Sequence, residues 1–394
     1  MFSLDKFYNT IHNNLISQFT NGRSVTFFPF GTYNNPTFLG NQFNQSHPMF
    51  GWEKDWPAEQ EFFHCYFFDQ EPFYDYTLPI VRNSILNQTN KHQPKRVSIL
   101  ANSDRSVLTD QCVQGFGMYN WYYFYHGFAA LDWYRDFQYV NPSSFDRFDK
   151  VFICYNHLTS NLRSYRLHLV SNLINQDLIQ YGHVSLFHKG WQESIEDQEN
   201  PLDNRARLKI YQALKDINEP LTIDTLNPDG TLSAYINFDD LTSALFHVVT
   251  ETVYFMPKLH LTEKVFKPIV AKRPFFLVST PGSLSYLKSY GFRTFDRWID
   301  ESYDQETDHY IRIEKITFEI AKLCAMSPAL LEQMHTEMQE VLEYNFNHFY
   351  TTFKDLIINE LVDNFENILK QIAIDRNHHL VLPDLEEVKK RLKQ

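Results

Sequence analysis

The stretch HLTEKVFKPIVAKRPFFLVSTPGSL, residues 260–284, opens on an acid and a base side by side. Thr262 offers a hydroxyl cap and Glu263 an acid in the first turn, which is typical of a helix start. Lys264 and Lys267 lie three residues apart, so both can project from one side of that turn. Because a helix N-terminus already favours negative charge, the two added lysines predict a phosphate-binding site.

Glu263 fits another part of the same ligand. A carboxylate would repel phosphate, so we expect it to accept hydrogen bonds from hydroxyl groups, such as those of a ribose diol. One short stretch can therefore contact both the phosphates and the ribose of a nucleotide diphosphate. The alternative is a capped, solvated helix start without a ligand, which is a common use of these residue types.

Around this stretch, short β-rich runs alternate with helical patterns, which is typical of a mostly parallel sheet with crossover helices. The sequence therefore predicts an α/β fold, with ligand-contacting groups in the loops beyond the carboxyl ends of the strands. The candidate strands are residues 24–30, 62–68, 96–102, 150–156, 243–251 and 273–279, and the candidate helices cover residues 157–178, 204–214, 284–290 and most of the chain from about residue 310.

A chain of 394 residues is too long for one core, so two domains are expected. The pattern pauses near residues 141–144. We therefore predict a first domain over residues 1–145, a second over residues 146–310, and C-terminal helices over residues 311–394.

The bulk composition bounds the function. The net charge of −12 disfavours passive binding to nucleic acid. No apolar run reaches the roughly 18–20 residues of a membrane span, and the first residues read as a helix rather than a signal peptide. The cysteines never form a C-x-x-C pair, which favours buried thiols in a reducing cytoplasm over a disulfide framework or a zinc site; they are Cys65, Cys112, Cys154 and Cys324.

The aromatic content is high, with 35 Phe and 23 Tyr. The run WYYFYHGFAALDWYRDF, residues 121–137, holds more aromatic side chains than one buried face needs. One interpretation is that these rings form a surface on which a sugar or a base stacks. The favoured interpretation is that they pack in a wide part of the hydrophobic core.

The run FHVVTETVYFMPKLHLTEKVFKPIVAKRPFFLV, residues 246–278, resembles the donor-binding motif of the α1,3-fucosyltransferase family. That motif has a strand ending in an acid, a variable loop, and T-E-K opening a helix. The two acids here are Glu251 and Glu263. The segment FICYNHLTSNLRSYRLHLV, residues 152–170, is similar to the preceding element of the family, which carries an asparagine and a diphosphate-binding arginine.

The resemblance implies a GT-B arrangement, in which two Rossmann-like domains face one cleft and the second holds the nucleotide sugar. It also implies inversion at the sugar carbon. The bulky Lys267-Pro268 departs from the family's small residues after T-E-K, so fucose is not assumed. The donor-binding residues expected from the motif and the resemblance together are Asn156, Arg163 or Arg166, Glu251, Thr262, Glu263, Lys264 and Lys267.

Sugar transfer also needs a base for the acceptor hydroxyl. The acids of Asp69-Gln70-Glu71-Pro72 end a first-domain strand, where the family has a similar acid-plus-proline ending, and Glu71 or Asp69 is the expected general base. His126 is a third candidate, although a histidine among aromatic residues is more often a core residue. Asp69-Gln70-Glu71 is only a loose analogue of a metal-binding Asp-x-Asp, so we expect lysine and arginine to stabilise the leaving phosphate without a metal.

The sequence thus predicts a cytoplasmic, metal-independent hexosyl- or pentosyltransferase. It would move a sugar from a nucleotide-diphosphate sugar, which is a co-substrate, to a hydroxyl of a glycan, a protein or a modified nucleic-acid base. The alternatives are a non-catalytic α/β binding or structural protein and a nucleotide-dependent transferase of another type. The last is disfavoured because G-x-x-x-x-G-K-[ST] and G-x-G-x-x-G are both missing from the sequence. Whether the chain forms a homo-oligomer stays open.

Overall fold

The computed structural model of the chain divides into two compact units. Unit 1 comprises Met1–Asp132 and Lys354–Gln394, and unit 2 is the continuous segment Trp133–Phe353. Unit 1 is therefore built from two segments far apart in the sequence. The residues that the structure describes are 2–16, 25–29, 62–70, 72, 96–115, 117–140, 148–187, 190–217, 221, 236–377 and 383–394.

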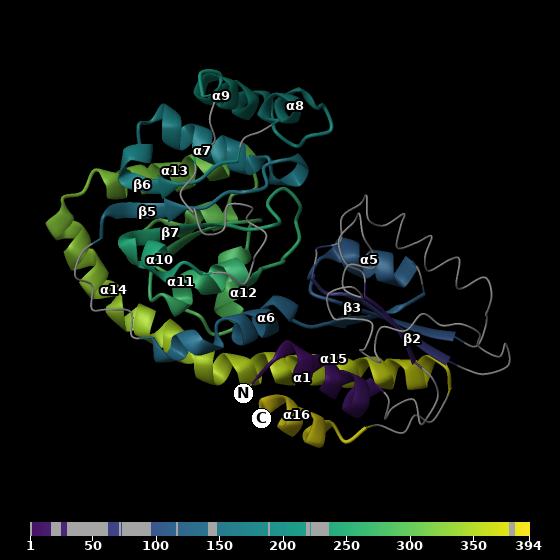
Figure 1. Cartoon of the computed structure of the whole chain (residues 1–394). Coiled ribbons are helices and arrows are strands. Elements are labelled where there is room, and N and C mark those ends of the chain that lie inside the picture. Colours follow the sequence, from purple (N-terminus) through teal and green to yellow (C-terminus); the bar gives the residue numbers. More distant parts are fainter. Residues whose placement is uncertain are drawn as a thin grey trace. The chain divides into compact units, whose positions relative to one another are not determined.

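The sheet of unit 1 has four parallel strands in the order β1-β2-β3-β4 (Figure 1). The strands are β1 (Val25–Pro29), β2 (Phe62–Phe68), β3 (Arg96–Asn102) and β4 (Tyr119–Tyr122). The other elements are α1 (Leu4–Thr10), the π-helical η1 (Ile11–Ile16), α5 (Val107–Gly115), α6 (Tyr125–Trp133), α15 (Lys354–Asp375) and α16 (Leu385–Lys393).

Helix α15 belongs to unit 1 because it packs against β4. The indole Nε1–H of Trp121 donates a hydrogen bond to the carbonyl of Leu361 (3.1 Å), and the ring of Trp121 contacts that of Phe365 with centroids 4.6 Å apart. The C-terminal helices predicted as one block are thus divided between the units: α13 and α14 belong to unit 2, and α15 and α16 to unit 1. The predicted boundary at residues 141–144 lies outside the described residues.

The sheet of unit 2 also has four parallel strands, in the order β6-β5-β7-β8. The strands are β5 (Lys150–Cys154), β6 (Gly182–Val184), β7 (Ala244–Thr250) and β8 (Phe275–Val278). The helices are α7 (Tyr165–Asn175), α8 (Trp191–Glu196), α9 (Asn204–Leu214), α10 (Phe238–Ser243), α11 (Phe266–Val270), α12 (Ser283–Ser289), α13 (His309–Cys324) and α14 (Pro328–His348). Short turns complete the unit: η2 (Arg135–Tyr139), η3 (Asn161–Arg163), η4 (Ile179–Tyr181), η5 (Glu263–Val265), η6 (Glu301–Gln305) and η7 (Phe349–Phe353).

Helices cover both faces of the unit 2 sheet. Figure 1 shows α7 and α13 on one side of β5 and β7, and α10 and α11 on the other. Every residue of β7 and β8 is buried. This explains why β8 is apolar throughout and β7 is mostly apolar, since strands covered on two faces are buried along their length.

The α/β class with parallel sheets is confirmed, and each of the six predicted strands is present with ends that differ by at most a few residues. Helix α9 has the predicted bounds. The sequence analysis missed β4 and β6. The aromatic run at residues 121–137 forms β4 and α6, and its Trp121, Tyr123, Phe124 and Phe128 are buried, so the core interpretation is confirmed there.

Two predictions from composition can be compared with the structure. Cys154 and Cys324 are free and buried, and burial raises the pKa of each thiol to about 12. Cys112 is half-buried. None of the described helices combines the length and the apolar character that crossing a membrane requires.

Candidate functional site

The strand order of unit 2 creates a topological switch point between β5 and β7. From β5 the chain passes through α7 to β6 on one side, whereas β7 and β8 lie on the other side. Loops that leave neighbouring parallel strands in opposite directions open a crevice at the carboxyl edge, where α/β proteins bind ligands. Both elements of the predicted donor site start at this edge, since Asn156 follows β5 and Glu251 follows β7.

Glu251 joins the end of β7 to the T-E-K turn. Its side chain is fully buried. The two carboxylate oxygens accept hydrogen bonds from the backbone N–H (3.2 Å) and the hydroxyl (2.6 Å) of Thr262. A buried carboxylate requires such partners, because an unpaired one is costly. Glu251 therefore positions the start of the turn, and both of its oxygens are engaged within the protein.

The turn after Thr262 is shorter than the sequence predicts. Thr262 is the N-cap, as predicted, and its hydroxyl accepts a hydrogen bond from the backbone N–H of Lys264 (3.4 Å). However, Glu263–Val265 forms a 3₁₀ turn and Phe266–Val270 a helix of only 5 residues. A macrodipole is the sum of aligned peptide units, so this short helix supplies little positive potential. Positive charge at this edge has to come from side chains.

Lys264 is the half-exposed cation of the turn. Its ammonium group donates hydrogen bonds to the hydroxyl of Thr262 (3.1 Å) and the carboxylate of Glu263 (3.3 Å). The side chain of Lys264 is 34% exposed, but that of Glu263 is only 4% exposed. Glu263 is therefore a buried counter-ion of Lys264, and little of its carboxylate is open to the hydroxyls of a ligand. Lys267 is half-buried one turn further along.

Asn156, at the end of β5, is buried with an unused acceptor. Its backbone N–H donates to the hydroxyl of Ser185 (3.0 Å), and its side-chain amide donates to the sulfur of Cys154 (3.2 Å). Within the described part of the chain, its side-chain carbonyl oxygen accepts no hydrogen bond. Buried polar atoms without a partner are rare in proteins and call for an explanation such as a ligand.

Arg166 is a clamp across the switch point. Its buried guanidinium donates to three backbone carbonyls: those of Leu158 (2.9 Å) after β5, and of Thr250 (3.0 Å) and Glu251 (3.2 Å) at the end of β7. Its Nε–H faces the hydroxyl of Tyr165 at 3.4 Å. Arg166 thus holds two loops together, and its donors are largely occupied by the protein.

Arg163 has a different environment. It ends the 3₁₀ turn Asn161–Arg163 just before α7 and is half-buried. Burial raises the pKa of Tyr165, and the nearby positive charges of Arg166 and Arg163 oppose that rise. Of the two arginines that the sequence left open, Arg163 is the less buried.

Tyr134 is a residue that the sequence analysis did not single out. It is fully buried, and its hydroxyl has no hydrogen-bond partner among the residues that the structure describes. Burial raises its pKa well above the ordinary value, and the carboxylates of Glu263 and Glu251 raise it further. The hydroxyl is thus a buried polar atom without a partner among the described residues, as is the side-chain carbonyl oxygen of Asn156.

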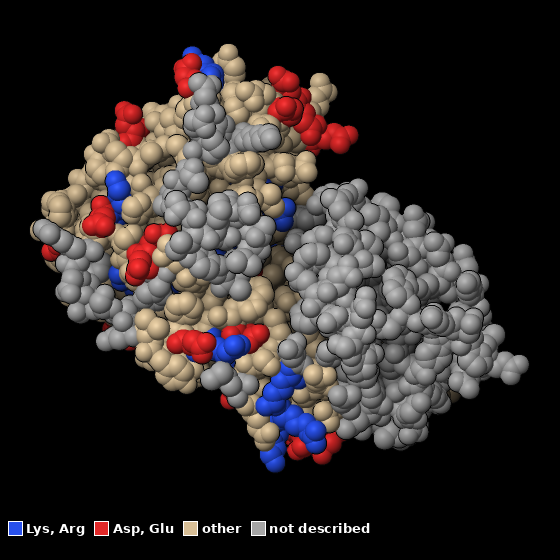
Figure 2. All heavy atoms as spheres, in the orientation of Figure 1, with Lys and Arg blue, Asp and Glu red and all other residues tan. Residues whose placement is uncertain are grey.

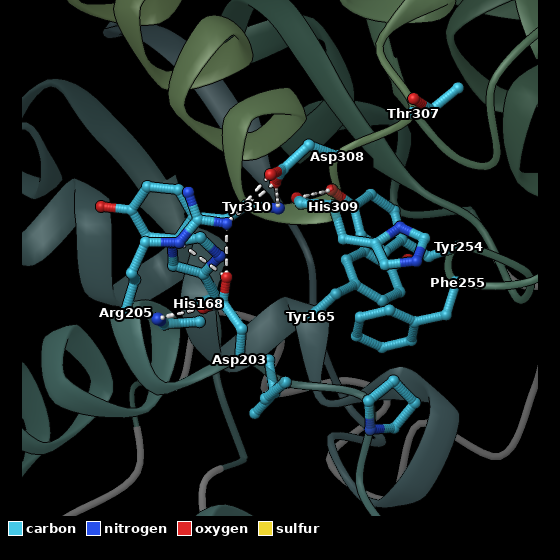
Figure 3. Close-up of a pocket in the computed structure, with 13 residues that line it drawn as sticks. Tyr165, His168, Asp203, Arg205, Tyr254, Phe255, Thr307, Asp308, His309 and Tyr310 are labelled. Atoms are coloured by element: carbon cyan, nitrogen blue, oxygen red, sulfur yellow. Dashed lines mark hydrogen bonds and ion pairs between the residues drawn. The ribbon is translucent and has the colours of Figure 1, made fainter.

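A pocket of about 230 Å³ lies beside the switch point on the α7 and α13 side (Figure 3). Its lining comes from the start of α7, the segment that leads into α9, the loop after β7 and the start of α13. Six of the lining residues have aromatic or imidazole rings: Tyr165, His168, Tyr254, Phe255, His309 and Tyr310. We call it the aromatic pocket.

In unit 1, the structure brings together two of the three predicted base candidates. Asp69 follows β2 and is fully buried, and its Oδ2 accepts hydrogen bonds from the hydroxyls of Tyr8 (2.8 Å) and Tyr123 (2.5 Å). Burial raises the pKa of Asp69, while the two tyrosine hydroxyls and nearby His126 oppose the rise. His126 is also buried, and its Nε2 lies 3.0 Å from the carbonyl of Gln70.

These contacts make Asp69 and His126 residues that hold the loop after β2. A general base has to reach the proton that it removes, and both side chains are buried. The third candidate, Glu71, lies outside the described residues. The identity of the base therefore stays a prediction.

No protein-family model matches the chain, and no curated protein or solved structure matches it either. The candidate site accordingly stands on its own geometry. Residues in the loops after β5 and β7 were predicted from the sequence, whereas Tyr134 and the aromatic pocket were not. The aromatic residues of TVYFMP, residues 252–257 in the loop after β7, are the part of the sequence that could have indicated the pocket.

Proposed function

We propose that the chain is a glycosyltransferase that binds a nucleotide-diphosphate sugar at the switch point of unit 2 and transfers the sugar to an acceptor hydroxyl. One observation carries the proposal: the side-chain carbonyl oxygen of Asn156, a buried polar atom without a partner among the described residues, follows β5 at the same sheet edge as the T-E-K turn that follows β7. This combination supports a ligand that carries both hydroxyl groups and negative charge.

Lys264 and Arg163 are the proposed diphosphate contacts. The ammonium group of Lys264 has three N–H donors and uses two within its own turn, so one can meet a phosphate oxygen. Arg163 lies in the segment that follows β5 and Lys264 in the segment that follows β7. A diphosphate between them would be neutralised from two separate segments, and Lys267 would add charge on the same side as Lys264.

The chemistry requires no further reactant. The acceptor oxygen forms a bond to the anomeric carbon while the bond from that carbon to the diphosphate oxygen breaks and leaves its electron pair on the phosphate. The proton of the acceptor hydroxyl passes to a base. Lys264 and Arg163 would stabilise the charge that develops on the leaving phosphate, which is an interaction that grows toward the transition state. Attack from the face opposite the leaving group gives inversion.

The proposal also covers the acceptor side, the general base and the role of metal ions. In a GT-B arrangement unit 2 holds the donor, and unit 1 supplies the acceptor side and the base from the loop after β2. Asp69 would position that loop and Glu71 would be its reactive acid. The proposal includes a metal-independent reaction, because lysine and arginine can carry the charge.

A glycan or a protein is the favoured acceptor over a nucleic-acid base. Acidic and basic side chains are both scattered over the described part of the face in Figure 2. Arg105, a partly exposed basic residue of unit 1, forms an ion pair with Glu360. Broad basic surfaces are what nucleic-acid binding ordinarily rests on.

The test is isothermal titration of the full chain with UDP-, GDP-, ADP- and CMP-sugars, followed by a transfer assay with the sugar that binds. Lys264→Ala should weaken donor binding at least tenfold, because a charge-assisted hydrogen bond to phosphate contributes about 1.5–3 kcal/mol. Lys315→Ala is the matched control, since Lys315 is 38% exposed and also pairs with one acid, Glu306.

Two outcomes would remove the proposal. If no nucleotide sugar binds, or if Lys264→Ala and Lys315→Ala bind the donor equally well, the phosphate assignment is wrong. If the donor binds but is never hydrolysed or transferred, the non-catalytic binding protein becomes the better description.

A further inference from the structure

We infer that the aromatic pocket holds the planar base of a nucleotide. This inference rests on the proposed function, because the base is one end of the ligand whose diphosphate we place at the switch point. It assigns a role to a part of unit 2 that neither strand-end motif includes.

The first wall of the pocket consists of stacked rings. Tyr165 and Tyr254 lie almost parallel, with ring centroids 4.2 Å apart and planes 14° apart. Phe255 stands edge-on to Tyr254 (5.2 Å, 88°) and to the ring of His309 (5.1 Å, 86°). Tyr165 and Tyr254 are buried, so Phe255 and His309 present the more exposed ring surfaces of this wall.

The opposite wall is fixed by charge. His168 and Tyr310 stack with centroids 4.9 Å apart and planes 19° apart. The guanidinium of Arg205 lies over the ring of Tyr310 at 4.3 Å and is held by the carboxylates of Asp203 (2.7 Å) and Asp308 (3.0 Å). Figure 3 shows Arg205 between these two carboxylates on one side of the pocket, with Tyr254 and Phe255 on the other. The pocket is therefore a preformed slot with two aromatic walls.

The rim offers hydrogen-bond donors to the edge of a ring. Nη2 of Arg312 donates to Nδ1 of His309 (2.9 Å), because a guanidinium cannot accept. Burial and the charge of Arg312 lower the pKa of His309, so the imidazole is neutral at pH 7 and carries its proton on Nε2. The Nε and Nη2 atoms of Arg205 donate to Asp203 and Asp308. Its Nη1 atom makes no hydrogen bond to the described residues. Ring nitrogens and carbonyl oxygens of nucleobases accept from such groups.

The pocket and the phosphate site share one loop. The hydroxyl of Tyr165 donates to the backbone carbonyl of Glu251 (2.5 Å), and the side chain of Glu251 holds Thr262 at the start of the T-E-K turn. The same loop carries Tyr254 and Phe255 into the aromatic pocket. A ligand that has a flat ring at one end and a diphosphate at the other matches this order of groups, since aromatic stacking and cationic contacts lie at opposite ends of the loop.

A crossed binding experiment tests the inference. Wild-type chain, Phe255→Leu and Lys264→Ala are titrated with the nucleoside diphosphate of the donor that binds, with the matching nucleoside, and with inorganic pyrophosphate. Phe255→Leu should weaken the nucleoside and the nucleoside diphosphate about 5- to 150-fold, the range of one base-stacking contact, and leave pyrophosphate unchanged. Lys264→Ala should weaken pyrophosphate and the nucleoside diphosphate and leave the nucleoside unchanged.

Phe318→Leu is the matched control, because Phe318 is 63% exposed on α13 outside the pocket. Circular dichroism and the unfolding temperature establish that each variant is folded, and Tyr310→Leu is the second variant if Phe255→Leu is not. The inference is overturned if the nucleoside binds Phe255→Leu and Tyr310→Leu as it binds wild type, or if pyrophosphate affinity falls in parallel. If no phosphate-containing ligand binds but the nucleoside binds saturably, the proposed function is wrong and the assignment of the aromatic pocket to a nucleobase stands.

Discussion

Replacing Arg166 by methionine should separate a structural arginine from a ligand-binding one. Methionine fills much of the same volume but removes the donors that reach the carbonyls of Leu158 and Thr250. The carbonyl of Glu251 keeps the hydroxyl of Tyr165 as a partner. We therefore expect one buried carbonyl, that of Thr250, to be left unpaired, and a second, that of Leu158, to exchange its partner for water.

The expected loss follows from these contacts. An unpaired buried carbonyl costs about 1–3 kcal/mol, and a hydrogen bond exchanged for one with water costs about 1 kcal/mol. The free energy of unfolding of unit 2 should therefore fall by about 2–4 kcal/mol. For a unit of this size, that loss lowers the unfolding temperature by about 4–16 °C. Arg163→Met is the comparison variant in the turn before α7, and it should cost less than Arg166→Met because Arg163 is half-buried whereas Arg166 is buried.

Calorimetry of the full chain measures the unfolding temperature, and hydrogen exchange of peptides covering residues 150–158 and 244–251 locates the loss. Arg166→Met should lose protection at both strand ends, whereas Arg163→Met should lose only donor affinity. The reasoning is refuted if Arg166→Met unfolds at the wild-type temperature with its exchange unchanged. It is also refuted if Arg163→Met is destabilised as much as Arg166→Met.

Three further changes test the fold and its electrostatics. Burial raises the pKa of Glu314, but hydrogen bonds from neighbours including Lys209 outweigh this effect and lower the pKa from 4.5 to about 2. The ionised Glu314 therefore stabilises the folded state above about pH 4.5, and this stabilisation is lost as the pH falls toward 2. In urea titrations, Glu314→Gln should reduce the loss of unfolding free energy between pH 4.5 and 2 by about 1 kcal/mol, a small value because partial exposure screens the ion pair. An unchanged pH dependence would contradict the assignment. Gly182→Ala should lower the unfolding free energy by about 1–3 kcal/mol, because its Cβ would lie 2.4 Å from ring atoms of the fully buried Phe152; a midpoint equal to wild type in denaturant would show that the strand can shift. Asp69→Asn should destabilise unit 1 by about 1–3 kcal/mol, because two tyrosine hydroxyls donate to one carboxylate oxygen, and thermal melts at pH 7 that match wild type would exclude this role.

Most strands could be predicted from the sequence because their burial leaves a local trace. β8 is apolar along its whole length and β7 is mostly apolar, and β2 and β3 have the predicted bounds. β6 has only 3 residues, too few to form a pattern. β4 was hidden in an aromatic run whose residues are all consistent with a core.

The candidate site divides in the same way. The cap at Thr262 and the position of Asn156 after β5 follow from neighbouring residues, so the sequence contains them. The choice between Arg163 and Arg166 does not, because it depends on carbonyls about 85 residues away, at the end of β7. The aromatic pocket is assembled from four separated segments, none of which is unusual by itself.

The two-part construction of unit 1 has a consequence for biosynthesis. A ribosome releases strands β1 to β4 long before it completes α15, which covers β4 and accepts the hydrogen bond of Trp121. Unit 2 is continuous, so it can reach its final state while the N-terminal sheet still waits for its last helix. A nascent chain that stalls after Phe353 would therefore expose the indole of Trp121, and its emission spectrum would report how far translation has gone.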